Sequence, residues 1–125
     1  MKCWICGNNA DSGEHMIKRS DLKMLFGSAT QEEPLYYNST DKKNFRIGSL
    51  NNWRLKSQSK ICSYCNNTRT QPFDRAWEKM SKALSARVSE LEIGDRIRAN
   101  QIFQYDTRQQ MLNLHLFFVK LFGCY

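Results

Sequence analysis

Apolar residues recur at helical spacing in the second half of the chain. From residue 73 to residue 91 they follow one another mostly at intervals of three and four, a pattern that predicts an amphipathic helix with its apolar face on a core. These residues are Phe73, Ala76, Trp77, Met80, Leu84, Val88 and Leu91. Pro72 is tolerated in the first turn of such a helix, and Gly94 is expected to end it.

A last helix is predicted from Asp106-Thr107, which supplies a capping side chain, to Gly123. Its residues 111–122 are apolar nearly all round, but the segment is too short and too often interrupted by polar residues for a membrane span. The interruptions are Asn113, His115 and Lys120. The helix is therefore either buried in a core or an association surface for a second copy or a partner protein. His115 is interpreted as a core or interface residue.

Elements in the first half of the chain are shorter. Ser20 as N-cap and Gly27 as stop predict a brief helix over residues 20–26. The end of a first strand is expected before it, at residues 14–19. Residues 34–37 are either a strand or an ordered loop. Residues 45–47 and 53–55 alternate in the way that a half-buried hairpin does.

Four of the five cysteines form two pairs with the same spacing. Cys3-x2-Cys6 and Cys62-x2-Cys65 together supply the ligands of a tetrahedral four-cysteine zinc site. Gly7 permits the unusual backbone angle that the first knuckle needs. The second knuckle is expected to open a helix near residue 63 or 64 that is interrupted around residues 70–72. Cys124 lies outside both pairs and is interpreted as a packed or frayed thiol.

Size and composition fit a single globular domain. The chain has 125 residues, of which 41% are hydrophobic, enough to bury a core that a bound metal then stabilises. Met1-Lys2 leads straight into the first cysteine pair without a signal segment, so we expect a cytoplasmic protein with reduced thiolates on metal. The chain stops on Cys124-Tyr125 without a polar tail, which indicates a piece of a longer protein.

Positive charge is concentrated in the middle of the chain. The formal net charge is +7 and the pI is about 9.3, which favours an acidic partner. No Asp or Glu occurs between Lys42 and Phe73, and the basic residues there are interleaved with aromatic ones, as on a surface that follows a phosphate backbone. The basic residues are Lys42, Lys43, Arg46, Arg54, Lys56, Lys60 and Arg69. Charge alone is explained equally well by a solvated face without a partner.

The order of these features resembles that of the zinc-containing HNH endonucleases found in phages, mobile elements and restriction or defence systems. The likeness rests on the first cysteine pair, Glu14-His15, a basic hairpin and the second cysteine pair with Asn66 directly after it. It covers roughly residues 3–75. The resemblance implies an α+β fold with a treble-clef or ββα-metal zinc finger core over residues 1–75 and a helical extension over residues 76–125.

The resemblance also implies roles for single residues. His15 would be the general base, and Glu14 and Asn66 would bind a catalytic Mg²⁺ or Mn²⁺ beside the structural Zn²⁺. The family's central Asn, which orients the base, would be Asn51 or Asn52; Asn52 is taken as the catalytic candidate and the choice stays open. The family most often has Asp in place of Glu14 and often His in place of Asn66, which leaves the identity of the metal open.

The chemistry asks for the same residue types independently. Hydrolysis of a phosphodiester in DNA needs a base that accepts a proton near neutral pH, as imidazole does. It also needs a cation to neutralise the charge that builds on the phosphate, and carboxylate and amide oxygens suit Mg²⁺ or Mn²⁺. Candidate phosphate contacts are Lys18, Arg19, Lys56, Lys60 and Arg69.

Two other classes of function compete with the endonuclease. One is a zinc-dependent nucleic-acid-binding module that does no chemistry. The other is a structural zinc domain that contacts proteins through its last helix, which leaves Glu14, His15 and the basic stretch unexplained. The combination of Glu14 and His15 with Asn66 separates the first two classes, because a binding module does not need it.

Overall fold

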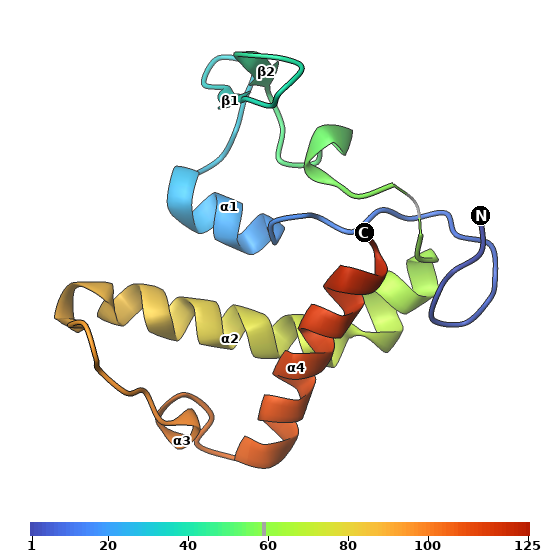
Figure 1. The fold of residues 1–125 in the computed structure, drawn as a ribbon. Coiled ribbons are helices and arrows are strands. Elements are labelled where there is room, and N and C mark those ends of the chain that lie inside the picture. The colour runs from blue at the N-terminus through green and yellow to red at the C-terminus, as the bar shows by residue number, and fades with distance from the viewer. Residues whose placement is uncertain (59) are drawn as a thin grey trace.

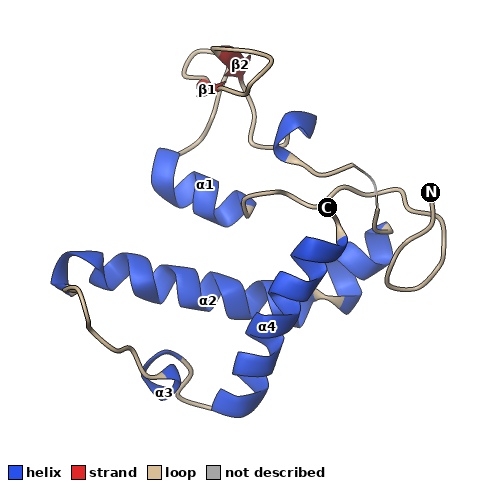
Figure 2. Cartoon of the chain, viewed as in Figure 1, coloured by secondary structure: helices blue, strands red, loops and turns tan. Residues whose placement is uncertain are grey.

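The computed structural model describes residues 1–58 and 60–125. The protein is a mixed α+β structure in which one short hairpin accompanies a set of helices (Figures 1 and 2). In chain order the elements are α1 (Arg19–Phe26), β1 (Leu35–Tyr37), β2 (Phe45–Ile47), the 3-10 helix η1 (Trp53–Leu55), the π-helix η2 (Cys65–Arg69), α2 (Gln71–Arg87), the 3-10 helix η3 (Val88–Glu90), α3 (Ala99–Ile102) and α4 (Thr107–Gly123).

Helices α2 and α4 pack against each other and form a buried helical cluster (Figure 1). Trp77 on α2 stacks on Phe117 of α4, with the ring centroids 5.2 Å apart and the planes at 2°. Ile102 and Phe103, at the end of α3, fill the same cluster. The predicted amphipathic helix is confirmed, with Pro72 in its first turn. It ends at Arg87, earlier than predicted, because the chain tightens into η3 before Gly94.

The hairpin pairs different segments from those predicted. Leu35 lies opposite Ile47 and Tyr37 opposite Phe45, so β1 is the antiparallel partner of β2. Residues 53–55 form η1 instead of a strand. The side chain of Asn52 accepts a hydrogen bond from the main-chain N–H of Arg54 at 3.0 Å and so caps this turn.

A second antiparallel pairing brings the N-terminal segment to the middle of the chain. Residues 12–16 run beside residues 55–58 and 60–61, joined by isolated bridges between Ser12 and Ile61 and between His15 and Lys56. The two bridges are three positions apart in the first segment and five positions apart in the second. This mismatch prevents a continuous ladder, so the strand predicted at residues 14–19 is wrong, although the pairing direction is that of a hairpin.

Helix α1 begins one residue before its predicted cap. Lys18 occupies the N-cap position, and Ser20 lies inside the first turn. Gly27 ends the helix as predicted, at a φ of +73°. Of the described helices, none is long and apolar enough to cross a membrane.

Besides the apolar Leu114 and Phe117, helix α4 buries polar residues, and some of its apolar residues are exposed. Asn113 and Lys120 are buried, whereas His115, Val119 and Phe122 are exposed. Of the two places predicted for His115, the core is therefore wrong, and an interface stays a prediction. Asp106 does stand at the N-cap of α4, but it has a φ of +49° and its side chain makes no capping hydrogen bond.

Candidate metal centre and the adjacent cleft

The four paired cysteines form one cluster. The sulfur atoms of Cys3, Cys6, Cys62 and Cys65 all lie within 4.8 Å of one another. The sulfurs of Cys6 and Cys62 are 3.6 Å apart. In a tetrahedral site with Zn–S bonds of about 2.3 Å, neighbouring sulfurs lie about 3.8 Å apart. The donor set and its spacing therefore fit a structural zinc ion.

The main-chain conformation of the first knuckle orients its two sulfurs towards one point. Gly7 adopts a φ of +78°, and its main-chain N–H donates to the carbonyl of Cys3 at 2.8 Å. The N–H of Cys3 donates to the carbonyl of Asn8 at 2.6 Å. These bonds close the turn between the two cysteines, as the position of the glycine predicts.

The thiols of the cluster are too close to ionise independently. For Cys3, burial opposes ionisation, but hydrogen bonds from the main chain of Cys62, Cys6 and Ile5 outweigh it and hold the pKa at about 6. For Cys65, burial and the neighbouring cysteines raise the pKa to about 12. A cation is what allows four such thiols to be thiolates together, because it neutralises their repulsion.

Cys124, the fifth cysteine, packs against this cluster without joining the group of four sulfurs. Its side chain is buried with Cys3, Ile61 and Cys62, and burial raises the pKa of its thiol. The interpretation of Cys124 as a packed thiol is confirmed.

A polar cleft of about 340 Å³ lies beside the cysteine cluster. It collects residues from the N-terminal segment, the loop before η1, and the helical segment that follows the second cysteine pair. The lining residues are Ser12, Gly13, Glu14, His15, Lys18, Arg19, Asn51, Lys56, Asn66 and Asn67. The structure thus brings Glu14, His15 and Asn66 together in one cavity.

His15 is half-buried and its ring is held by one hydrogen bond. Nε2 lies 2.9 Å from the main-chain carbonyl of Leu50. A carbonyl only accepts, so Nε2 carries the proton and Nδ1 is left with the lone pair. Burial is the main cause that lowers the pKa of His15, and the charge of Lys56 adds to it. The imidazole is therefore neutral at neutral pH.

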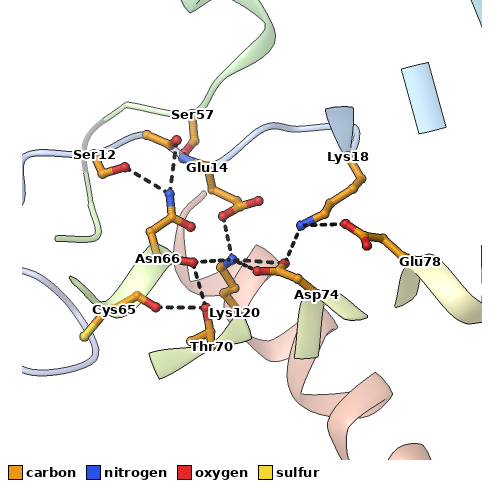
Figure 3. A network of polar contacts seen from close by, with 11 residues as sticks. Ser12, Glu14, Lys18, Ser57, Cys65, Asn66, Thr70, Asp74, Glu78 and Lys120 are labelled. Carbon is orange, nitrogen blue, oxygen red and sulfur yellow. Dashed lines mark hydrogen bonds and ion pairs between the residues drawn. The ribbon is translucent and has the colours of Figure 1, made fainter. Parts of the chain in front are cut away.

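Glu14 is buried, with 6% of its surface exposed, and its Oε2 is paired with the ammonium of Lys120 at 2.8 Å. Lys120 is itself 2% exposed and also donates to Asp74 at 3.0 Å. Asp74 in turn pairs with Lys18 at 2.7 Å. Figure 3 shows this chain of alternating charges from Glu14 through Lys120 and Asp74 to Lys18.

Asn66 is oriented by the N-terminal segment. Its amide nitrogen donates to the hydroxyl of Ser12 at 2.9 Å and, more weakly, to the carbonyl of Gly13 at 3.5 Å. The amide oxygen consequently points away from Ser12 and towards the side on which Glu14 lies (Figure 3). Helix η2, a π-helix, carries Asn66, and such helices are frequent at functional sites.

The two candidate central asparagines lie in different places. Asn51 lines the cleft beside His15. Asn52 caps η1 through its side chain instead. Because Asn51 directly follows Leu50, whose carbonyl holds the ring of His15, it is the asparagine better placed to influence that ring.

The candidate phosphate contacts are divided between several surfaces. Arg19 and Lys56 line the cleft. Lys18 also lines it but is engaged by Asp74. Lys60 donates to the carbonyl of the C-terminal Tyr125. Arg69 borders a separate, mainly apolar groove between the first knuckle and α4.

Reasoning from the sequence missed Lys120 and Asp74. The position of Lys120 inside an apolar helix was a signal in the sequence, because a lysine there is buried only when it has acidic partners. Nothing local identifies those partners, however, since one lies on α2 and the other is at the opposite end of the chain.

Comparison of the chain with protein-family models, with curated proteins and with solved structures found no match.

Proposed function

We propose that the chain is a metal-dependent endonuclease of the HNH kind that hydrolyses phosphodiester bonds in DNA. The observation that carries the proposal is the single cleft lined by His15, Glu14, Asn51 and Asn66 beside the cysteine cluster. The antiparallel bridges that join Ser12 to Ile61 and His15 to Lys56, followed by a helix after the second cysteine pair, support a treble-clef or ββα-metal core.

In this proposal His15 is the general base. With Nε2–H committed to the Leu50 carbonyl, Nδ1 accepts the proton of the attacking water. The water oxygen then forms the new bond to phosphorus, and the bond between phosphorus and the leaving oxygen breaks. The lowered pKa of His15 supports this role, because a neutral imidazole is ready to accept a proton.

Glu14 and Asn66 would hold the catalytic metal. Among the described residues, Glu14 Oε1 and Asn66 Oδ1 receive no hydrogen bond, and both residues line the cleft. Carboxylate and amide oxygens are hard ligands that suit Mg²⁺ or Mn²⁺. When bound, such an ion supplies positive charge to the phosphate and to the leaving oxygen. Arg19 and Lys56 would bind the flanking phosphates.

A non-catalytic, zinc-dependent nucleic-acid-binding module is the second candidate. It is favoured by one observation: Lys120 already neutralises the Glu14 carboxylate at 2.8 Å, so the charge of Glu14 does not require a metal. A binding module of this kind keeps the zinc cluster and the basic cleft but releases no cleaved product.

The experiment that separates the two candidates compares His15→Ala with His115→Ala. Both variants remove an imidazole, but His115 is exposed on α4 and lies outside the cleft. Plasmid DNA is incubated with each protein in Mg²⁺, Mn²⁺ or EDTA. We expect His15→Ala to lose about 10²- to 10⁴-fold in cleavage rate while it keeps its zinc and its DNA affinity, and His115→Ala to cleave like the wild type.

Equal rates for the wild type and His15→Ala would refute the assignment of His15. If the wild type binds DNA but cleaves no nucleic acid with any divalent metal, the binding module is the correct function.

A further inference from the structure

Lys120 connects α4 to the parts of the chain that carry the candidate catalytic residues. Its ammonium lies 2.8 Å from Glu14 Oε2 and 3.0 Å from Asp74 Oδ2. A third, longer contact of 3.5 Å reaches the main-chain carbonyl of Asn66. The three protons of an ammonium therefore have three acceptor residues, which come from the N-terminal segment, η2 and α2.

The position of the Asn66 carbonyl follows from the local helix geometry. In the π-helix the N–H of Thr70 donates to Cys65 at 3.1 Å. The carbonyl of Asn66 is left to accept from the hydroxyl of Thr70 at 3.2 Å and from Lys120. Figure 3 shows the Lys120 ammonium between Glu14, Asp74 and the main chain of Asn66.

Because these side chains are buried, water cannot replace the contacts between them. The side chain of Lys120 is 2% exposed, and that of Glu14 is 7% exposed. A buried ammonium needs its partners, because water is not there to replace them. The position of the Glu14 carboxylate is therefore tied to the position of α4, and its second oxygen remains for the cleft.

We propose that Lys120 is a positioning residue of the candidate nuclease site: it holds the Glu14 carboxylate and the main chain of Asn66 so that the side-chain oxygens of both residues face one metal position. The inference rests on the proposed function. Lys120 touches neither the metal position nor the substrate in this arrangement. It acts through Glu14 and Asn66, as the groups behind metal ligands do.

The test uses the full, zinc-loaded chain and compares Lys120→Met and Lys120→Arg with Asp21→Asn. Methionine keeps the length of the side chain without the charge. Arginine keeps the charge, so the network stays neutralised, but its planar guanidinium cannot take the place of an ammonium. Asp21 is the matched control: it is a buried acid that bonds Trp77 at 2.6 Å and Ser81 at 2.7 Å, and it lies outside the cleft.

Two measurements are made on every variant that retains its zinc. The first is the Mn²⁺ concentration that gives half-maximal plasmid cleavage. The second is Mn²⁺ binding without DNA, from the electron paramagnetic resonance signal of the free ion. Loss of a residue that orients metal ligands typically costs about 10- to 100-fold in metal affinity. We expect both midpoints to rise at least about tenfold for Lys120→Met or Lys120→Arg and to stay unchanged for Asp21→Asn.

Unchanged midpoints in the folded Lys120 variants, or an equal rise in Asp21→Asn, would overturn the inference, because Lys120 would then have only a structural role. If Lys120→Met loses its zinc, the midpoints of Lys120→Arg alone decide whether the inference holds. Failure of the proposed function looks different. If the wild type binds Mn²⁺, the Lys120 variants bind it more weakly, and none of them cleaves nucleic acid, the nuclease is refuted and the positioning role is kept. A wild type that neither binds Mn²⁺ nor cleaves refutes both.

Discussion

Gly13→Ala is the substitution that tests the geometry of the cleft most directly. Gly13 lies between Ser12 and Glu14, where the N-terminal segment passes the middle of the chain. A Cβ atom added at this position would lie 2.7 Å from the carbonyl oxygen of Ser57 and 3.3 Å from Cβ of Lys56. The neighbouring carbonyl is main chain, so it cannot turn aside as the end of a side chain would.

The size of the disturbance follows from these distances. An ordinary contact begins at 3.4 Å, so the Ser57 carbonyl and Gly13 must separate by about 0.7 Å. The separation strains the hydrogen bond of 2.7 Å from the Ser57 N–H to the Glu14 carbonyl. Overpacking of this kind costs about 1–3 kcal/mol in stability. Displacement of catalytic groups by about 1 Å costs about 10²-fold in rate.

The assay pairs Gly13→Ala with Gly27→Ala. Gly27 has a φ of +73° and ψ of −156°, a conformation that strains any other residue, and no atom lies within 4 Å of an added Cβ. Its replacement costs a similar amount, about 1–3 kcal/mol, without moving the cleft. Thermal unfolding should therefore show comparable losses, while plasmid cleavage and the NMR signals of the His15 ring should change only in Gly13→Ala.

Two results would refute this reasoning. If Gly13→Ala unfolds at the wild-type temperature, the close approach to Ser57 does not exist in solution. If both glycine variants cleave equally fast at equal folded fractions, the spacing between these two segments does not set the geometry of the site.

Three further predictions concern the zinc, the asparagines and the basic cleft. Removal of zinc with a chelator should unfold residues 1–70 in circular dichroism, because the metal contributes folding energy directly; a folded protein without zinc would contradict this. Asn52→Ala should lower the free energy of unfolding by about 0.5–2 kcal/mol through loss of its cap and leave plasmid cleavage intact. Asn51→Ala should slow plasmid cleavage and leave stability intact. Similar losses of stability and of cleavage for both variants would contradict the division of roles. DNA affinity should fall steeply with salt, and Lys56→Gln should reduce the slope of log affinity against log salt by about one; a flat dependence in gel shifts would exclude phosphate binding in the cleft.

Features that depend only on residues close together in the sequence could be predicted. The cysteine pairs have a fixed local spacing, and their sulfurs meet within 4.8 Å. The periodic apolar residues of α2 and the stop at Gly27 are equally local. Strand pairing was not, because residues 45–47 have a candidate partner on each side in the sequence, and the pairing with residues 35–37 forms while the cap of Asn52 turns residues 53–55 into a 3-10 helix.

Within the candidate site, the sequence identifies residue types better than their surroundings. Glu14, His15 and Asn66 line one cleft, and their neighbours in the chain marked them out. The pair formed by Glu14 and Lys120 joins the two ends of the chain, so no local pattern could reveal it. Lys120 was interpreted as a polar interruption in an apolar helix, whereas its burial is what connects that helix to the cleft.

The place of Lys120 along α4 bears on which function is correct. Leu114, before it, packs in the helical cluster, and Cys124, after it, packs in the cysteine cluster. Stability alone does not call for a charge between two apolar clusters, because buried ion pairs are often replaced by apolar residues at no cost. The ion pair does fix where the Glu14 carboxylate stands at the edge of the cleft, because the Lys120 ammonium holds its Oε2 at 2.8 Å. The same pair also neutralises Glu14 without a metal, so Mn²⁺ binding and plasmid cleavage, and not the network itself, decide between the proposed nuclease and the binding module.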